Sequence, residues 1–284
     1  MPWQVFILLS IPFYSVATLL QRILLKEDKS DPVAYTVFFL IMVTAVYLVF
    51  GFLTKQIAYT DPRPFFLNFL LTSFLYGIGT VLLFKGLKSI EASEYTIVYA
   101  SRILFTIISS SLIIHEGLKG LQIFGVVLIL AAILAIFLRR KKFEFKKGHL
   151  FILLGSMCFG LEVVNDRIIL HSFDVYLFLF FATLGPAIMI LILYPKTIFK
   201  LGSFLKKSFL IRQGFISLIY GLGAISYFYA LKTTTSSSLV ASLNQLQTVL
   251  TVLLAMIFLH ETKHTGRKIL GAILSFIGAV ILIK

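Results

Sequence analysis

The sequence contains few charged residues, and acidic residues are especially few. There are 12 aspartates and glutamates against 26 lysines and arginines. Charged residues make up only 13% of the 284, whereas a soluble domain carries about a quarter. Hydrophobic residues make up 59%, and the mean hydropathy is +0.98. So few polar residues do not cover a water-soluble fold of this size. We therefore expect lipid to be the main solvent of the chain.

Several kinds of chemistry lack their sequence signature. A single cysteine, Cys158, excludes an intrachain disulfide and a CxxC metal site. No Walker A motif is present, so we expect coupling to an ion gradient or to exchange rather than to ATP. The pairs His115–Glu116 and His260–Glu261 lack the HExxH spacing of zinc hydrolases, and adjacent side chains diverge. We expect no metal, no cofactor and no enzymatic activity.

The net charge of +14 comes from basic residues that gather between apolar runs. The densest group, Arg139-Arg140-Lys141-Lys142 with Lys146 and Lys147, directly follows an apolar segment. Such a juxtamembrane position is typical of a topology signal and of binding to anionic lipid head groups. The sequence therefore indicates a multi-pass protein of the plasma or inner membrane, with lipid rather than nucleic acid as the partner of residues 139–147.

Apolar segments long enough to cross a bilayer follow one another along the whole chain. With about 20 residues for each span, we predict ten helices, at 3–25, 33–54, 65–87, 93–114, 120–138, 149–170, 174–194, 208–231, 236–259 and 266–283. The first lacks the basic start of a cleavable signal peptide, so we expect it to be retained. The predicted fold class is an all-α integral membrane protein.

The second half of the chain repeats the pattern of the first. Gly77-Ile-Gly79 corresponds to Gly221-Leu-Gly223, Phe84-x-x-Leu87-Lys88 to Phe228-x-x-Leu231-Lys232, His115-Glu116 to His260-Glu261, and Gly125 to Gly271. We predict two five-helix repeats, 1–138 and 149–284, joined by a basic linker, 139–148. Because five is odd, the second repeat crosses the membrane in the opposite sense. Inverted repeats are typical of secondary transporters that bind substrate near the midplane.

The repeated residues resemble the EamA module of the drug/metabolite transporter superfamily. The matching positions are Phe84 to Lys88, Glu116 and Gly125 in one half, and Phe228 to Lys232, Glu261 and Gly271 in the other. The resemblance implies a ten-helix transporter of small organic molecules. The family often has a proline in the middle of the fourth and ninth helices, but here Ile103 and Thr248 lie near those positions. We therefore expect a different bending element.

Lysine and arginine are distributed unequally between the two sides of the predicted bundle. The odd-numbered connections hold nineteen of them, and the even-numbered connections with the C-terminus hold six. The positive-inside rule places both termini outside the cell, whereas the resemblance implies that both lie in the cytoplasm. The orientation therefore stays open, as does the choice between import and export.

Ionisable residues at membrane depth are expensive unless they face a cavity or a partner. The sixth predicted helix holds Glu162, Asn165 and Asp166, and Glu162 and Asp166 share one face because they are four residues apart. We interpret Glu162 as a group that exchanges a proton or cation in a central cavity. The alternative is an internal ion pair with Arg102, Arg22 or Arg167.

The fourth and ninth predicted helices carry the other candidate binding residues. Arg102 lies too deep to face lipid, and it either binds an anionic group of the substrate or neutralises Glu162. Asn244 and Thr248 belong to a small-and-polar stripe on the ninth helix, and Gln245 and Gln247 flank it. The other members of this stripe are Ser237, Ala241 and Thr251. Tyrosines on inner helices are candidates for the cavity walls: Tyr95, Tyr99, Tyr227 and Tyr229.

These features together predict a secondary-active transporter of small polar metabolites, similar to amino acids or amines. Alternating access between the two repeats and coupling to protons or to exchange follow from the same hypothesis. The alternative is a flippase for a lipid-linked or amphipathic substrate. Small residues at Gly271, Ser275 and Ala279 form a ridge on the last helix. This ridge permits close packing within a monomer or across a weak homodimer.

Overall fold

The computed structural model describes residues 3–27, 31–114, 120–139, 142, 143, 145–234, 240, 243–261 and 265–282. In these residues the fold is helical apart from one small hairpin, which confirms the all-α membrane class. The hairpin pairs β1 (Leu138–Arg139) with antiparallel β2 (Lys142–Phe143). It begins at Leu138, the last residue of the fifth predicted helix, and continues into the predicted linker 139–148, whose last two residues are already helical.

The helices follow the predicted segments closely. The first half contains α1 (Trp3–Glu27), α2 (Pro32–Thr54), α3 (Phe66–Ser89), α4 (Ala92–Tyr99), α5 (Arg102–Ile114) and α6 (Gly120–Phe137). The second half contains α7 (Lys147–Leu170), α8 (Val175–Leu193), α9 (Ile198–Leu201), α10 (Lys207–Thr233), α12 (Leu246–Phe258) and α13 (Thr265–Leu282). Single 3₁₀ turns lie at Arg63–Phe65, Pro195–Thr197 and Gly202–Leu205.

Two of the predicted helices are broken rather than continuous. The fourth divides into α4 and α5 at Ala100–Ser101, and the ninth has a turn at Asn244–Gln245 before α12 begins. At both breaks the amide groups bond three residues back, as in Leu104 N to Ser101 O at 2.9 Å and Thr248 N to Gln245 O at 2.9 Å. The breaks are 144 residues apart and occupy equivalent places in the repeat. They bend the helices without the proline of the family pattern.

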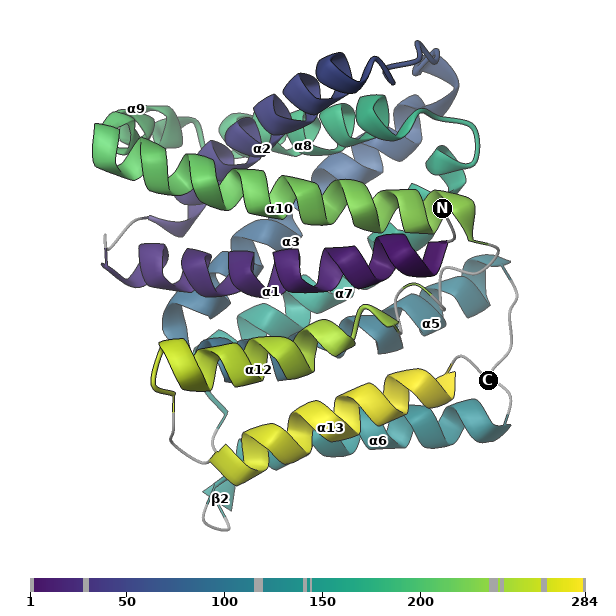
Figure 1. The fold of residues 1–284 in the computed structure, drawn as a ribbon, viewed down its shortest axis with the longest axis vertical. Coiled ribbons are helices and arrows are strands. Elements are labelled where there is room, and N and C mark those ends of the chain that lie inside the picture. Colours follow the sequence, from purple (N-terminus) through teal and green to yellow (C-terminus); the bar gives the residue numbers. More distant parts are fainter. Residues whose placement is uncertain are drawn as a thin grey trace.

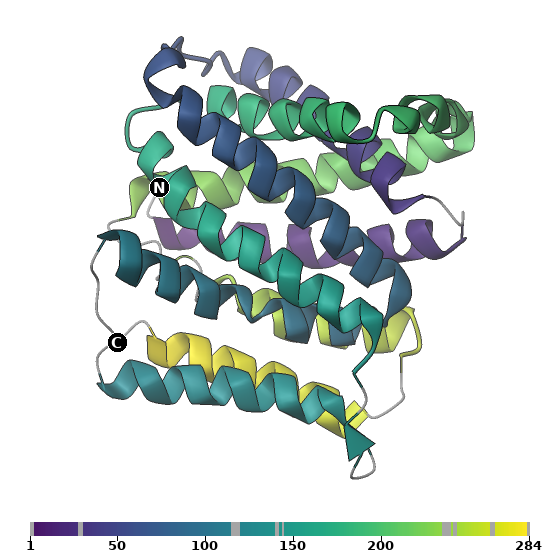
Figure 2. The ribbon, with the colours of Figure 1, turned by 180° about the vertical axis from the view of Figure 1, so that it is seen from behind.

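The helices form two layers in which the repeats are interlocked. One layer contains α10, α1 and α12, and the other contains α3, α7 and α4–α5 (Figures 1 and 2). The first helix of each repeat therefore lies between two helices of the other repeat. The pairs α2–α8 and α6–α13 join equivalent helices of the two repeats at the two ends of the bundle. The main contacts between helices thus have counterparts in the two repeats, as a two-fold pseudo-symmetry requires.

The two repeats run in opposite directions. Figure 1 shows α6 ending at the hairpin on one side of the molecule, whereas its equivalent α13 ends on the opposite side. Likewise α3 ends close to Gly148 beside the hairpin, whereas α10 ends on the side where the N-terminus is marked. We call the side with Ser89, the hairpin and Glu261 the hairpin face. The repeats are therefore inverted, as predicted.

The outer surface of the bundle is apolar. Seven of the helices in the described part of the chain are long and apolar enough to cross a membrane. Large hydrophobic side chains point outward from them, such as Leu112 and Ile192, each 72% exposed. Exposed apolar area on this scale requires lipid around it. The total of ten spans stays a prediction.

An acidic cap fixes the start of α2. Asp31 accepts hydrogen bonds from the amides of Val33 and Ala34, and Pro32 occupies the first helical position. Asp31 also binds Lys200 of the second repeat. Partial burial raises the pKa of the Asp31 carboxyl, but the bonds from Lys200 and the two amides outweigh this and hold the pKa below its ordinary value. Connections near the membrane surface thus carry ordinary, solvated ion pairs.

The small residues of the last helix are used inside the chain. Ser275 and Ala279 are fully buried, and α13 packs along α6. A Cβ atom on Gly271 would lie 3.4 Å from the carbonyl oxygen of Ala132 on α6. The predicted ridge therefore brings the two equivalent helices of one molecule together.

A glycine allows α5 and α7 to approach closely beside the layer boundary. A Cβ atom on Gly160 would lie 2.4 Å from Cβ of Phe105 and 2.8 Å from the carbonyl oxygen of Arg102. Since backbone atoms are among these neighbours, a side chain here displaces a whole helix.

We expect Gly160→Ala to destabilise the protein by about 1–3 kcal/mol, the usual cost of overpacking. Gly214→Ala is the matched control, because the nearest atom to its added Cβ, Cε of Met42, lies 3.8 Å away. This control should be neutral or slightly stabilising, since alanine favours helix over glycine. Melting temperatures in detergent measure both effects, and an unchanged melting temperature for Gly160→Ala would contradict the close approach.

Candidate functional site

A cavity of about 100 Å³, lined by aromatic and ionisable side chains, lies between the two layers. This volume has room for several water molecules. The lining comes from both layers and both repeats: Tyr14, Thr18, Gln21, Phe39, Tyr76, Thr80, Leu83, Phe84, Tyr95, Tyr99, Arg102, Phe159, Glu162, Val163, Asp166, Tyr220, Tyr227, Phe228, Asn244 and Gln247. Six of the predicted site residues are among them, namely Glu162, Asp166, Arg102, Asn244, Tyr95 and Tyr99.

Two carboxylates line the cavity from adjacent turns of α7. Glu162 is 2% exposed and Asp166 is 4% exposed, so both are removed from bulk water. Within the described residues Glu162 has no hydrogen bond and no ion pair, and Asp166 has only a long bond from the Thr72 hydroxyl at 3.5 Å. A carboxyl group in this setting is either protonated and neutral, or charged and stabilised by water or a bound cation.

A cation faces the same space from the start of α5. The guanidinium of Arg102 donates to the Tyr99 hydroxyl at 3.0 Å and lies over the Tyr99 ring, 4.9 Å from its centre. No carboxylate among the described residues pairs with it. The internal ion pair between Arg102 and Glu162, one of the two alternatives from sequence, is therefore not formed. Most of the five donors of Arg102 remain available to a ligand.

Tyrosine side chains form much of the wall. Tyr95 stacks on Tyr99 with ring centres 5.8 Å apart, and Tyr14 packs edge-on against Tyr220 at 5.2 Å. The hydroxyls of Tyr76 and Tyr220 lie 2.9 Å apart and share a hydrogen bond between the layers. Such a wall offers apolar area and hydroxyl groups together, which suits an organic ligand with several polar atoms.

Three predicted site residues lie outside the lining. Asn165 bonds to α3 instead: it donates to the Asn68 carbonyl at 3.0 Å and to the Thr72 hydroxyl at 2.9 Å. Gln245 and Thr248 are buried within the bundle. The reason is the turn at Asn244–Gln245, which changes the helical register. In a continuous helix the polar residues would form one stripe, but the turn divides this stripe into two parts. As a result Asn244 and Gln247 reach the cavity.

One tyrosine considered as a wall also lies elsewhere. Tyr229 donates to the Gln56 side chain at 2.8 Å and stacks on Phe6, with ring centres 5.6 Å apart. Of the two His–Glu pairs, His115–Glu116 lies outside the described residues. Glu261 of the other pair binds backbone amides at the start of α4.

Sequence reasoning did not find several lining residues of α1 and α3. Tyr14 and Thr18 lie on α1, which has no charged residue at its centre to mark an inner face. Tyr76 had a detectable signal, because it and Tyr220 are repeat equivalents, each directly before a paired glycine. Equal residues at equivalent positions in an inverted repeat point to the axis between the halves, where the cavity lies.

The charges of the cavity do not follow the pseudo-symmetry. With Tyr76 matched to Tyr220 and Tyr14 to Phe159, the equivalents of Glu162 and Asp166 are Ala17 and Gln21. The equivalent of Arg102 is Leu246. The fold therefore does not require these charges, since the other repeat adopts it without them. A separate role in the cavity explains why they are present.

Comparisons with known proteins agree with this architecture. The sequence profile described as the EamA-like transporter family matches twice, over residues 1–138 and 146–284. A solved structure, described only as a crystal structure of a protein, superposes with a TM-score of 0.71 over 98% of this chain and 95% of that chain. Its sequence identity is 16%, so it supports the fold alone. No curated protein matches the sequence. The chain belongs to the EamA-like transporter family of the drug/metabolite transporter superfamily and is an integral, multi-pass membrane transporter.

Proposed function

We propose that this transporter is secondary-active and carries small polar metabolites that bear both a cationic and an anionic group. It works by alternating access, in which the two layers open the cavity to one side of the membrane at a time. Coupling is to protons or to exchange of a second substrate. The plasma or inner membrane is the proposed location.

The observation that carries this proposal is that Glu162 and Arg102 face one cavity without a direct ion pair between them. Glu162 and Arg102 line the same space, and neither has an ion-pair partner among the described residues. An unpaired charge at this depth costs several kcal/mol. A ligand that carries both charges removes this cost at both ends, which gives the site its affinity for such a ligand.

The lining also favours certain substrate chemistry. The Arg102 guanidinium suits a carboxylate or phosphate, with which it makes two parallel hydrogen bonds. Glu162 and Asp166 suit an ammonium group, and the stacked Tyr95 and Tyr99 offer ring faces to its organic part. An amino-acid-like zwitterion satisfies both ends, whereas a simple amine satisfies only the acidic one. Because the cavity lies between the two layers and polar side chains of both repeats line it, we favour a small soluble molecule over a lipid-linked one.

Coupling follows from competition for one carboxylate. Because Glu162 is buried and has no fixed cation, it either binds a proton or receives the cationic group of the substrate. A carrier with this property exchanges protons for substrate across the membrane. Other contacts of the protein belong to the same proposal: the exposed Lys146 and Lys147 bind anionic head groups, and the protein is a monomer or a weak homodimer.

We expect Glu162→Gln to abolish uptake driven by a pH gradient in proteoliposomes, because a glutamine does not bind and release a proton at this site. The matched control is Asp61→Asn, an exposed carboxylate that pairs with Arg63 away from the cavity. This control should transport like the original protein. Gradient-driven uptake that survives Glu162→Gln in a folded protein removes Glu162 from the coupling step.

Arg102 should determine which ligands bind. A thermal-shift screen against amino acids, amines, nucleosides and sugar phosphates identifies a stabilising ligand. We expect Arg102→Gln to weaken that ligand roughly ten- to a hundredfold, the range for a lost hydrogen bond to a charged group. The variant should also bind the ligand and its uncharged carboxamide analogue equally well. Continued preference for the charged ligand would show that another group binds the anionic end.

A further inference from the structure

A second cluster of charged residues lies on the hairpin face, outside the cavity. The side chain of Glu261, just after α12, accepts hydrogen bonds from the amides of Ala92 at 2.9 Å and Ser93 at 3.0 Å. It also accepts one from the Ser93 hydroxyl at 2.6 Å. The first amides of a helix have no partner within the helix and favour negative charge. Glu261 therefore caps α4 from the other repeat.

The path of the chain after α12 places this carboxylate. His260 adopts the left-handed backbone conformation, with φ of 51°, and so ends the helix and reverses the chain. Glu261 then points back at the start of α4. Histidine is one of the residue types that adopt this conformation more readily than most.

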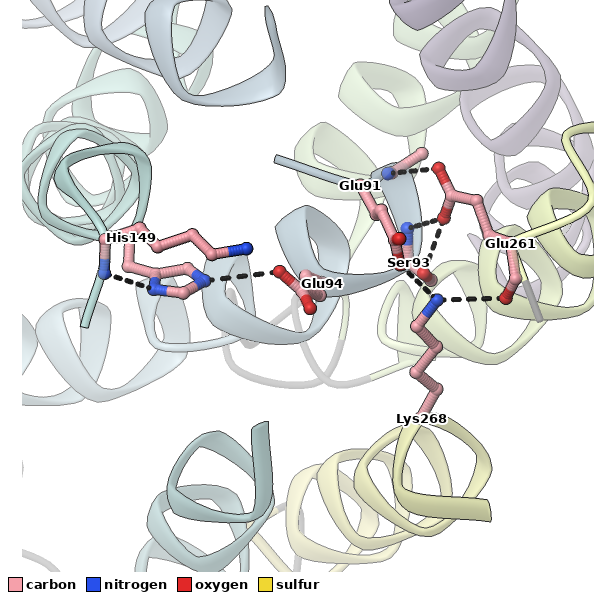
Figure 3. A network of polar contacts seen from close by, with 8 residues as sticks. Glu91, Ser93, Glu94, His149, Glu261 and Lys268 are labelled. Atoms are coloured by element: carbon pink, nitrogen blue, oxygen red, sulfur yellow. Dashed lines mark hydrogen bonds and ion pairs between the residues drawn. The ribbon is translucent and has the colours of Figure 1, made fainter. Parts of the chain in front are cut away.

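A lysine completes the cluster. Lys268 on α13 is 1% exposed, and its ammonium binds the carboxylate of Glu91 and the carbonyl oxygen of Glu261, the latter at 2.9 Å. Figure 3 shows Lys268 between these two acidic residues, directly below the capped start of α4. The same buried cation therefore binds the side chain of Glu91 and the backbone of Glu261.

This cluster joins the two layers that enclose the cavity. Glu261 and Lys268 follow α12 in the chain, whereas Glu91 and Ser93 begin α4 in the opposite layer. On its other side α4 is held to its own layer, where His149 of α7 contacts Glu94 at 3.4 Å (Figure 3). Moving the layers apart on this face therefore breaks the contacts of Glu261 and Lys268 but leaves α4 attached to α7.

The same helix covers the cavity. Tyr95 and Tyr99 line the cavity from α4, and they lie within two turns of Ser93. When the start of α4 separates from α12 and α13, the part of the cavity wall that Tyr95 and Tyr99 supply therefore moves with it.

The repeat shows which part of the cluster is specific to this face. The equivalents of Glu261 and Ser93 are Glu116 and Ser237, so the capping pair is present twice in the sequence. The equivalents of Glu91 and Lys268 are Thr235 and Gln122, which are uncharged. The ion pair is therefore an addition on the hairpin face that the opposite face lacks.

We propose that Glu91, Ser93, Glu261 and Lys268 form an inter-repeat gate that closes the cavity toward the hairpin face and opens during the transport cycle. The Lys268–Glu91 ion pair sets the balance in favour of the closed state on this face. The gate rests on the proposed function, since only alternating access requires a barrier that opens and closes.

Thiol labelling tests the gate without a substrate. A reporter, Thr80→Cys, is placed in the cavity of a protein that also carries Cys158→Ser, and a membrane-impermeant maleimide is applied to the hairpin face of oriented vesicles. We expect Lys268→Met, and separately Glu91→Gln, to raise the labelling rate at least about tenfold, as the loss of a charged hydrogen bond in a two-state equilibrium predicts.

Lys200→Met is the matched control, because it removes an exposed ion pair that also joins the repeats, with Asp31, but does not touch α4. Its labelling rate should not change. The gate is overturned if both Lys268→Met and Glu91→Gln label at the original rate, or if Lys200→Met accelerates labelling equally. Glu91 is partly exposed, so Glu91→Gln tests the idea even if Lys268→Met does not fold. If the proposed function is wrong, the result is different: the original protein shows no gradient-driven uptake, whatever the labelling rates.

Discussion

The structure depends on the cost of placing charged and polar groups in hydrocarbon. Lipid offers no hydrogen bonds, so each ionisable side chain at membrane depth must find a partner or a wet space inside the bundle. Arg102, Glu162 and Asp166 lack strong partners and all line one cavity. The charged residues near the hairpin face follow the same constraint with a different solution, because Lys268 and Glu261 are fully engaged by neighbouring groups.

The two-fold pseudo-symmetry distinguishes the residues that build the fold from the residues that give the cavity its own chemistry. Paired features such as Tyr76 and Tyr220, or the breaks at Ala100 and Asn244, occur in both repeats and shape the cavity. The charged residues that line the cavity, and those of the Lys268–Glu91 ion pair, have no charged counterpart in the other repeat. They provide binding chemistry inside the cavity and an ion pair at its hairpin side. Interlocking of α1 and α7 between helices of the other repeat explains how such similar halves form one stable bundle.

Much of the fold could be predicted from sequence because apolar length and repeated motifs determine it. The helix positions, the inverted repeats and the inward placement of Glu162, Asp166 and Arg102 follow from those signals. The breaks were harder to find, since no proline or glycine marks Ala100–Ser101 or Asn244–Gln245. A break shifts the register, and for this reason only Asn244 of the three residues predicted on the ninth helix lines the cavity, together with Gln247, whereas Gln245 and Thr248 do not.

Contacts between distant segments lay beyond prediction for a related reason. Nothing local in Glu261 or Lys268 indicates that they bind the start of α4, about 170 residues earlier in the chain. Periodicity identifies an inner face, but the neighbours of that face depend on how the layers are interlocked. The bonding of Asn165 to α3 rather than to a ligand has the same origin.

The two repeats run in opposite directions, and labelling of single cysteines measures on which side of the membrane their equivalent helices end. Ser89→Cys and Thr233→Cys, each in a protein with Cys158→Ser, follow the equivalent residues Lys88 and Lys232 at the ends of α3 and α10. The account predicts that a membrane-impermeant reagent labels one of them only from inside the cell and the other only from outside. Labelling of both from the same side would contradict it.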